Sequence, residues 1–214
     1  MTDAGLLLVL SDPGSVPEAE FHDWYDGEHV PARTALPQFR HATRWRAADG
    51  ERPRWLATYD VTDLSVLEDP SYTTLREHRS ARERAVIAGL ASFERRTYLR
   101  LSDTLAPGRP ADDRAPFVLA VSLDVPAALE DELNRWYAEE HVPMLHAVPG
   151  WLRTRRYRLL DGTAPRWLAL HDLAGTEVFD SPQYAAAVTT EDRDHVMRHL
   201  VGKERRLFAV HRRF

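Results

Sequence analysis

The stretch Arg135–Trp151, RWYAEEHVPMLHAVPGW, decides the fold because it repeats an earlier stretch, DWYDGEHVPARTALPQF at Asp23–Phe39. Both contain Trp-Tyr-x-x-Glu-His-Val-Pro, and a second proline follows six residues after the first. Matching residues are 112 positions apart, as Trp24 and Trp136 are. Two long motifs at one fixed spacing indicate an internal repeat.

The repeat continues beyond these motifs. The same offset joins Asp-Gly at 49–50 and 161–162, PRWLA at 53–57 and 165–169, and Pro-x-Tyr at 70–72 and 182–184. Between Leu6 and Tyr72, roughly 25 of about 67 aligned positions are identical. Near the end of each copy, ERR at 94–96 matches ERR at 204–206 at an offset of 110. The sequence therefore predicts a tandem duplication, with a first repeat at 1–102, a Pro-, Gly- and Asp-containing linker at 103–115 and a second repeat at 116–214.

Within each repeat, strand and helix patterns alternate. Apolar runs at 6–10 and 117–123 predict buried strands, and apolar residues at helical spacing predict a helix that ends at Pro31 or Pro143. Two strands joined by the Asp-Gly turn follow, at 39–47 and 54–61 and again at 151–160 and 166–173. Helical regions at 70–90 and 182–201 precede last strands at 94–101 and 205–214. The order βαββαβ predicts an α+β fold of two tandem ferredoxin-like repeats. Each sheet has one bare face that the other can cover, so we expect an intrachain α+β barrel, a fused dimer.

The composition excludes several classes of protein. The 214 residues are 43% hydrophobic and 29% charged, with a net charge of -5, so we expect neither a nucleic-acid nor a membrane partner. The absence of cysteine excludes disulfides and thiolate chemistry and suits the cytoplasm. The apolar run at 6–10 is too short for a signal peptide or a membrane span. Lys203 is the one lysine, and this preference for arginine is typical of a GC-rich bacterial genome.

His29 and His141 are the first candidates for chemistry. Each lies at the predicted end of a helix, where the dipole favours imidazolium, and histidine can move protons to or from a carbon acid or phenol. The structural interpretation is that each histidine caps helix carbonyls where the chain turns. Tyr25 and Tyr137 lie four residues earlier on the same helix face, either holding a substrate oxygen or forming the rim of the core.

One strand of each repeat supplies the opposite wall of the expected pocket. Trp55 and Tyr59 alternate on one face of this strand in the first repeat, as Trp167 and His171 do in the second. The pocket is expected between the first helix and the sheet, lined by Tyr25, His29, Trp55 and Tyr59, or by Tyr137, His141, Trp167 and His171. The difference between Tyr59 and His171 suggests that the two pockets have diverged, and the two histidines favour the second.

Other candidates carry weaker signals. Tyr72 and Tyr184 either donate into the pocket mouth or pack on the sheet. Arg54 and Arg166, like Arg44 and Arg156, are expected to make surface or inter-sheet pairs, although an arginine in a pocket would bind a carboxylate. Trp24 and Trp136 are expected in the core. Glu191, His195 and His199 share a helix face but are expected to be solvated, and no metal site is predicted.

The repeated motif with its Pro-Gly-Phe/Trp-like ending, WYDGEHVPARTALPQF and WYAEEHVPMLHAVPGW, resembles the EthD-like branch of the dimeric α+β-barrel superfamily over nearly the whole chain. The resemblance implies an enzyme without a cofactor that acts on a small aromatic or polyketide-like metabolite by cyclisation, dehydration, decarboxylation or related proton transfer. A non-catalytic small-molecule-binding or accessory protein is the main alternative. Haem binding and cofactor-free monooxygenase activity are further ones. A fused dimer can be monomeric, and larger homo-oligomers remain open.

Overall fold

The computed structural model describes residues 3–110 and 114–214. The first half runs from β1 to β4 and the second half from β5 to β8. The first half contains β1 (Gly5–Asp12), α1 (Glu18–Trp24), a π-helical turn (Tyr25–His29), α2 (Val30–Thr34), β2 (Phe39–Ala47), β3 (Trp55–Val61), a 3-10 turn (Leu64–Leu67), α3 (Pro70–Glu77), α4 (Ala81–Gly89) and β4 (Ser92–Leu105).

The second half repeats this order of elements. It contains β5 (Phe117–Asp124), a 3-10 turn (Ala127–Leu129), α5 (Glu130–Trp136), a π-helical turn (Tyr137–His141), α6 (Val142–His146), β6 (Trp151–Asp161), β7 (Trp167–Leu173), a 3-10 turn (Glu177–Asp180), α7 (Pro182–Ala187), α8 (Glu191–Arg198) and β8 (Gly202–Arg213). The bounds of α1 and α5, of the two π-helical turns, and of β3 and β7 differ by the same 112 positions as the sequence motifs.

The eight strands form a closed antiparallel barrel in a mixed α+β fold. They are hydrogen-bonded in the order β1-β3-β2-β8-β5-β7-β6-β4. In the first half Leu7 of β1 lies between Tyr59 of β3 and Thr97 of β4. In the second half Leu119 of β5 lies between His171 of β7 and Leu207 of β8. Each half therefore places a proton-transfer side chain, Tyr59 or His171, next to its central strand.

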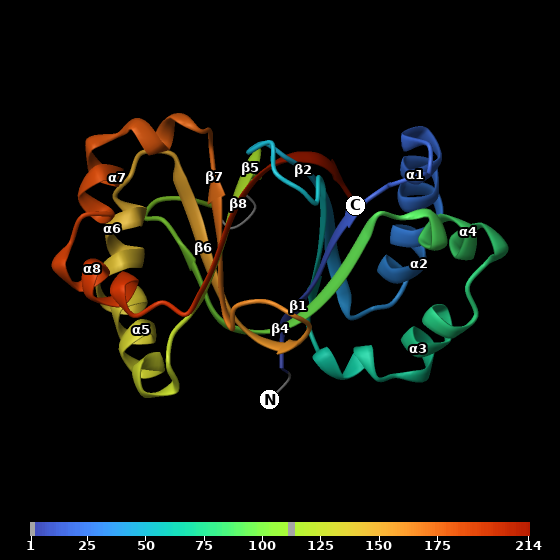
Figure 1. The fold of residues 1–214 in the computed structure, drawn as a ribbon, viewed down its shortest axis with the longest axis horizontal. Helices are drawn as coiled ribbons and strands as arrows, with labels where there is room; N and C mark the ends of the chain where they lie inside the picture. Colours follow the sequence, from blue (N-terminus) through green and yellow to red (C-terminus); the bar gives the residue numbers. More distant parts are fainter. Residues whose placement is uncertain (1–2, 111–113) are drawn as a thin grey trace. The chain divides into compact units, whose positions relative to one another are not determined.

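The chain divides into two compact units. One comprises the residues up to Arg100 with 159–163 and 210–214, and the other comprises 101–158 and 164–209. Within each unit the helices gather on one face of its sheet, α1 to α4 in the first and α5 to α8 in the second (Figure 1). Strand β4 continues to Leu105, so the segment expected as a linker at 103–115 begins inside a strand. The part of that linker at 111–113, and the first two residues of the predicted first repeat, lie outside the described residues.

The prediction that Pro31 and Pro143 end the first helix of each half is wrong. The helix continues to Thr34 and to His146 through a π-helical turn, in which the N–H of residue 30 or 142 donates to the carbonyl five residues earlier. In a regular helix the proline ring would clash with the carbonyl four residues before it. The wider turn changes that register, and each proline falls in the first turn of the following helix, where a missing N–H costs little.

The core of each unit lies between its helices and its sheet. In the first, Phe21, Trp24 and Tyr25 pack on the sheet face that carries Leu7 and Val9. In the second, Leu133, Trp136 and Tyr137 pack with Leu123 and Ala169. Trp24 and Trp136 are buried, as expected for core residues. Among the described residues, no helix has the length and apolar character to cross a membrane.

Candidate functional site

The π-helical turn of each half brings its histidine against two aromatic rings. Ring centroids of Tyr25 and His29 lie 4.9 Å apart, and those of Tyr137 and His141 lie 5.4 Å apart. The tryptophan one position before each tyrosine also contacts the histidine, with Trp136 stacked on His141 at 4.3 Å. Single π-helical turns are rare and often occur at functional sites. The repeated motif therefore encodes a fixed aromatic setting for one imidazole in each half.

The glutamate of the repeated motif has a structural role. In the first half the hydroxyl of Ser80 donates to the Glu28 carboxylate, and in the second half Thr190 Oγ1 donates to Glu140 Oε1 at 2.5 Å. Ser80 and Thr190 are also the N-caps of α4 and α8. Each motif glutamate therefore ties the first helix to the start of the last helix of its half.

His29 in the first half is held in a buried ionic cluster. Its Nδ1 donates to Glu83 Oε1 at 3.0 Å, and Arg33 Nη2 lies 3.5 Å from the same oxygen. Arg33 Nη1 also donates to the backbone oxygen of His29 at 2.9 Å. Burial lowers the pKa of His29 to about 4, although Glu83 opposes the shift. The imidazole is therefore neutral at pH 7, and its Nδ1–H is committed to Glu83.

His141 in the second half has a different environment. The N-caps Ser80 and Thr190 align at an offset of 110, so Arg193 occupies the position of Glu83. Leu145 occupies the position of Arg33. The Nδ1 of His141 is buried and has no hydrogen-bond partner among the described residues.

The protonation state of His141 follows from this setting. Burial, with Arg193 as the next contribution, lowers the pKa of His141 to about 4, although the backbone of Ala187 opposes the shift. A neutral imidazole in the tautomer that carries its proton on Nε2 presents a free lone pair on Nδ1, the group that a general base requires.

His141 and His171 line one cavity of about 70 Å³ in the second half. Most of its other lining residues are apolar or aromatic, namely Leu119, Val121, Leu123, Trp136, Tyr137, Leu145, Trp151, Tyr184, Val188 and Met197. Three are basic, namely Arg193, Lys203 and Arg205. Lys203 and Arg205 are exposed, whereas Leu119 and His171 are buried. The cavity thus has a basic mouth and a floor of apolar groups and imidazole.

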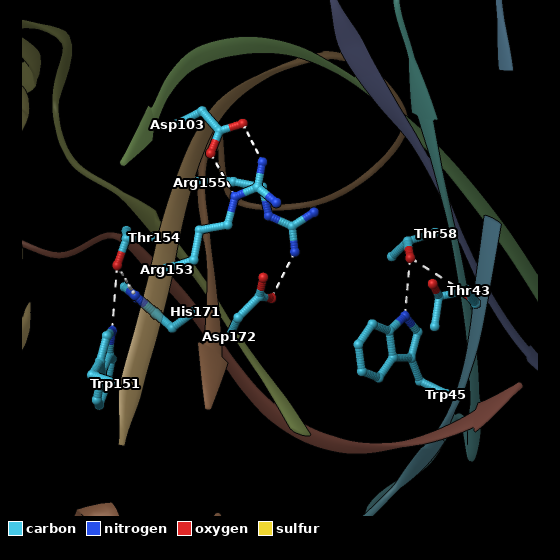
Figure 2. A network of polar contacts seen from close by, with 10 residues as sticks. All are labelled: Thr43, Trp45, Thr58, Asp103, Trp151, Arg153, Thr154, Arg155, His171 and Asp172. Carbon is cyan, nitrogen blue, oxygen red and sulfur yellow. Dashed lines mark hydrogen bonds and ion pairs between the residues drawn. The ribbon is translucent and has the colours of Figure 1, made fainter. Parts of the chain in front are cut away.

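A hydrogen-bonded group fixes His171 (Figure 2). The hydroxyl of Thr154 lies 3.0 Å from Nδ1 of His171 and 3.1 Å from Nε2 of His146, and it accepts from Trp151 Nε1 at 3.3 Å. The rings of Trp151 and His171 meet edge to face at 5.0 Å. Burial, with His141 as the next contribution, sets the pKa of His171 well below its ordinary value, so His171 is neutral.

The first half has a smaller cavity of about 50 Å³. His29, Tyr59 and Tyr72 line it, together with Leu7, Val9, Arg33, Arg76, Arg79, Glu83, Ile87, Phe93 and Arg95. The hydroxyls of Tyr25 and Tyr59 lie near each other without forming a hydrogen bond of normal geometry, and burial raises the pKa of both phenols. Since His29, Arg33 and Glu83 are all among the lining residues, the buried ionic cluster forms one wall of this cavity.

The remaining predicted site residues divide between cavity walls and core. Tyr137 and Tyr184 line the second cavity with the two histidines, and Tyr184 also stacks on Trp151 at 6.0 Å. Trp55 and Trp167, which we expected in the pockets, are buried core residues and are not among those that line the two cavities. Tyr25 lies beside the first cavity without lining it.

The expectation of surface or inter-sheet pairing is wrong for Arg44 and Arg156. Arg44 is 1% exposed, pairs with Asp26 and lies 4.3 Å over the ring of Tyr25. Arg156 lies 4.0 Å over the ring of Tyr137 and donates to Asn134 Oδ1 at 2.9 Å. Strand alternation places both guanidinium groups on the helix-covered face, where α1 and α5 bury them.

The other charged candidates lie at the surface. Arg54 pairs with Asp12 at 3.3 Å and Arg166 with Glu130 at 2.5 Å, in agreement with surface pairing. His195 pairs with Glu132 at 3.0 Å and is partly exposed. No group of three or more potential metal ligands occurs within 3–110 and 114–214.

The sequence reasoning missed Trp151, Arg193, Lys203 and Arg205 as cavity residues. Aligning the two N-cap positions would have shown that arginine replaces glutamate at position 193, although the contact of this position with the histidine is not visible in the sequence. The strand positions of Lys203 and Arg205 could have been found from the register of the ERR motif. Trp151 lies in the repeated motif, and its sequence position carries no other signal of a cavity residue.

Comparisons with known proteins identify the fold. No protein-family model matches the chain, and no curated protein matches it either. An anthrone oxidase-like protein of known structure is 12% identical with a TM-score of 0.72, and the match covers 99% of this chain and 92% of that one. A mutant chlorite dismutase from Candidatus Nitrospira defluvii in complex with cyanide is 11% identical with a TM-score of 0.64, covering 99% and 92% of the two chains.

A third similar structure has a different description. A major regulator of staphylococcal pathogenesis is 9% identical with a TM-score of 0.55, and the match covers 97% of this chain and 99% of that one. These similarities establish the eight-stranded fold of the dimeric α+β-barrel proteins. An oxidase-like protein, a dismutase and a regulator share this fold, so function has to be argued from the site.

Proposed function

We propose that this protein is an enzyme of the EthD-like type that moves a proton on a small aromatic or polyketide-like molecule, using His141 in the second-half cavity. The observation that carries the proposal is the buried, free Nδ1 of His141, which lines one cavity with His171. A buried polar atom without a partner is costly in a folded protein, and a catalytic role is one of the explanations for such an atom.

In this mechanism His141 Nδ1 accepts a proton from a carbon acid or a phenol of the substrate. Its pKa of about 4 keeps it unprotonated at pH 7, and transfer becomes more favourable when negative charge develops beside it. Arg193 and the phenol of Tyr137 line the same cavity and can stabilise the oxyanion that forms. His171, held by Thr154, orients the substrate oxygen from the floor.

The first half serves as a structural counterpart in this proposal. His29 is already hydrogen-bonded to Glu83, so its Nδ1 is not free to accept a substrate proton. The two halves, with their matching elements, are proposed to derive from a duplication and to make a chain that needs no second copy. Residues 1–102 expressed alone should then self-associate, and a stable monomeric half would contradict this part of the proposal.

A haem group, one of the alternatives that the family resemblance implied, does not fit these residues. Pockets for drug-sized ligands are typically about 300–1,000 Å³, whereas the cavity at His141 and His171 is about 70 Å³. A macrocycle centred on either imidazole would have to displace the rings of Trp136 and Trp151. The same volume suits the reacting end of a substrate whose remainder lies across the open, basic mouth.

The test measures proton transfer directly. A panel of small aromatic ketones and phenolic polyketide fragments is incubated with the protein in D₂O, and deuterium incorporation is followed by proton NMR. We expect catalysed exchange at an acidic C–H of at least one compound. The His141→Gln variant should lose at least about a hundredfold of this activity, the scale of general-base catalysis.

The matched control is His29→Gln, which alters the corresponding histidine of the first half. Its exchange rate should stay within about twofold of the wild type in the temperature range where it remains folded, because that histidine contacts no substrate. Equal losses in the two variants, or full activity in His141→Gln, would contradict the assignment. Binding of the compounds without exchange would favour a non-catalytic binding protein.

A further inference from the structure

We infer that the second-half cavity binds an anion, and that its ligand is a ring-bearing carboxylate. This inference names the ligand class of the site proposed above and rests on that proposal for its location. It derives from carboxylates that are present in the first half and missing at the corresponding positions of the second.

The first missing carboxylate is the partner of the buried arginine. In the first half Asp26 pairs with Arg44, whose guanidinium is buried under α1. In the second half Arg156 is also buried, but position 138, which corresponds to Asp26, is alanine. Within 3–110 and 114–214, Arg156 has Asn134 and the ring of Tyr137 as partners and forms no ion pair. A buried charge without a counter-ion is strongly unfavourable.

The second missing carboxylate lies beside the motif histidine. Glu83 contacts His29 and Arg33 in the first half, whereas Arg193 stands at its position in the second. The only ion pair of Arg193 among the described residues joins it at 3.4 Å to its exposed neighbour Asp194. The first-half cavity therefore has one carboxylate, Glu83, among its arginines, whereas the lining of the second-half cavity has none.

Two further cations enlarge this positive region. Lys203 and Arg205 of β8 face the cavity next to Leu123 and Val121 of β5. Arg205 lies 5.1 Å over the ring of Phe179, and neither basic side chain has an ion-pair partner among the described residues. No described residue that lines this cavity is acidic. Cavities lined by one sign of charge concentrate ligands of the opposite sign.

The walls and the donors together select a carboxylate attached to a ring. Trp136, Tyr137, Trp151 and Tyr184 supply flat apolar surface, which suits an aromatic or otherwise planar group. Arginine presents a planar fork of donors that matches a carboxylate. A ligand carboxylate at Arg193 would also raise the pKa of the neighbouring His141, since a nearby negative charge favours imidazolium. Such a ligand would make His141 a stronger base.

The experiment titrates the protein with benzoate, benzamide and inorganic phosphate and follows the fluorescence of the cavity tryptophans, Trp136 and Trp151. Benzoate and benzamide have the same shape and differ in charge. We expect benzoate to bind at least about tenfold more tightly, the value of one charge-assisted hydrogen bond. Its affinity should decrease as salt increases. Phosphate should compete weakly, because it lacks the ring.

Three variants locate the site. Arg193→Glu should abolish the preference for benzoate, and Ala138→Asp should weaken it by giving Arg156 an internal counter-ion. Arg95→Gln changes the first-half residue that corresponds to Arg205 and should leave binding unchanged. Circular dichroism and thermal unfolding confirm that each variant is folded, and Ala138→Asp, at an exposed position, keeps the test valid if Arg193→Glu fails to fold.

Equal binding of benzoate and benzamide, or a preference that survives both Arg193→Glu and Ala138→Asp, would overturn the inference. Phosphate binding as strong as benzoate binding would overturn the carboxylate assignment. Charge-selective binding without deuterium exchange on any compound would remove the proposed function and leave the anion site in place. Deuterium exchange without charge-selective binding would remove the anion site and leave the proposed function in place.

Discussion

The two halves place the same histidine on the same π-helical turn and surround it with different charged groups. In the first half Glu83 and Arg33 close a cluster around His29. In the second half Arg193 and Leu145 replace them, and the Nδ1 of His141 is left free. A repeated motif thus does not imply a repeated function. The backbone geometry fixes where the imidazole lies, and a few neighbouring side chains decide whether it stabilises the fold or is available to a substrate.

The largest expected effect is on stability, from removing the negative charge at one position. Glu83→Gln leaves Arg33 and His29 buried without their anion, which should cost about 3 to 5 kcal/mol of unfolding free energy. The corresponding change in the second half, Arg193→Gln, breaks no buried pair and should stay within about 0.5 kcal/mol. Urea unfolding at pH 7 measures the free energy of unfolding of both variants. Similar losses in the two variants would mean that the two clusters are equally structural.

The next effect is the dependence of stability on pH. The pKa of His29 is about 4 in the folded protein, below its ordinary 6.5, so between these values the unfolded chain binds the proton and the folded chain does not. Stability should therefore fall as the pH decreases from 6.5 to 4, by about 3 kcal/mol for His29. The pKa of His141 is also about 4, so its contribution to this pH dependence should be similar.

Urea unfolding of the wild type and of His29→Gln across this pH range checks the prediction. In the variant, the free energy of unfolding should depend less steeply on pH, because the contribution of His29 is absent. Saturating benzoate should reduce the contribution of His141 and leave that of His29 unchanged, because an anion beside the imidazole raises its folded pKa. Stability that is constant between pH 6.5 and pH 4 would mean that these histidines are solvated in the folded protein.

A smaller effect concerns the group that orients His171. Thr154→Val removes the hydroxyl that contacts His171, His146 and Trp151, at a cost of about 2 kcal/mol for the buried polar atoms left without partners. Proton-transfer activity should fall about tenfold, since a misplaced catalytic group loses part of its effect. The first half offers a control in Thr58→Val, which removes the acceptor of the Trp45 indole N–H (Figure 2). This control should lose stability but keep its activity, and an equal loss of activity would argue against a role for His171.

Most of the fold could be predicted because it depends on local patterns. Apolar runs, the Asp-Gly hairpin turns and the repeated order of elements predicted all eight strands, and β2 has the predicted bounds, Phe39–Ala47. The helix that continues past Pro31 could not be predicted by the rule that proline ends a helix, because the π-helical turn satisfies the backbone in a different register. The extension of β4 to Leu105 was also missed, since its last residues are polar and exposed.

The site could be predicted only in part because charge pairing depends on tertiary contacts. The helix spacing placed Tyr137 and His141 on one face, and strand alternation placed His171 towards the helices, so these three were named correctly as neighbours of one cavity. Trp167 alternates with His171 but is covered by the core around α5. Whether His29 has a counter-ion depended on Glu83, which is 54 residues away in the sequence.

The most direct test of the difference between the halves is an NMR titration of the histidine side chains. Protein labelled with ¹³C at histidine is titrated with benzoate, and the signals of His29, His141 and His171 are assigned from single His→Gln variants. We expect the signals of His141 and His171 to shift with one common dissociation constant, while the signal of His29 stays in place. Shifts of His29 equal to those of His141, or a His141 signal that does not respond while benzoate binds, would contradict this expectation.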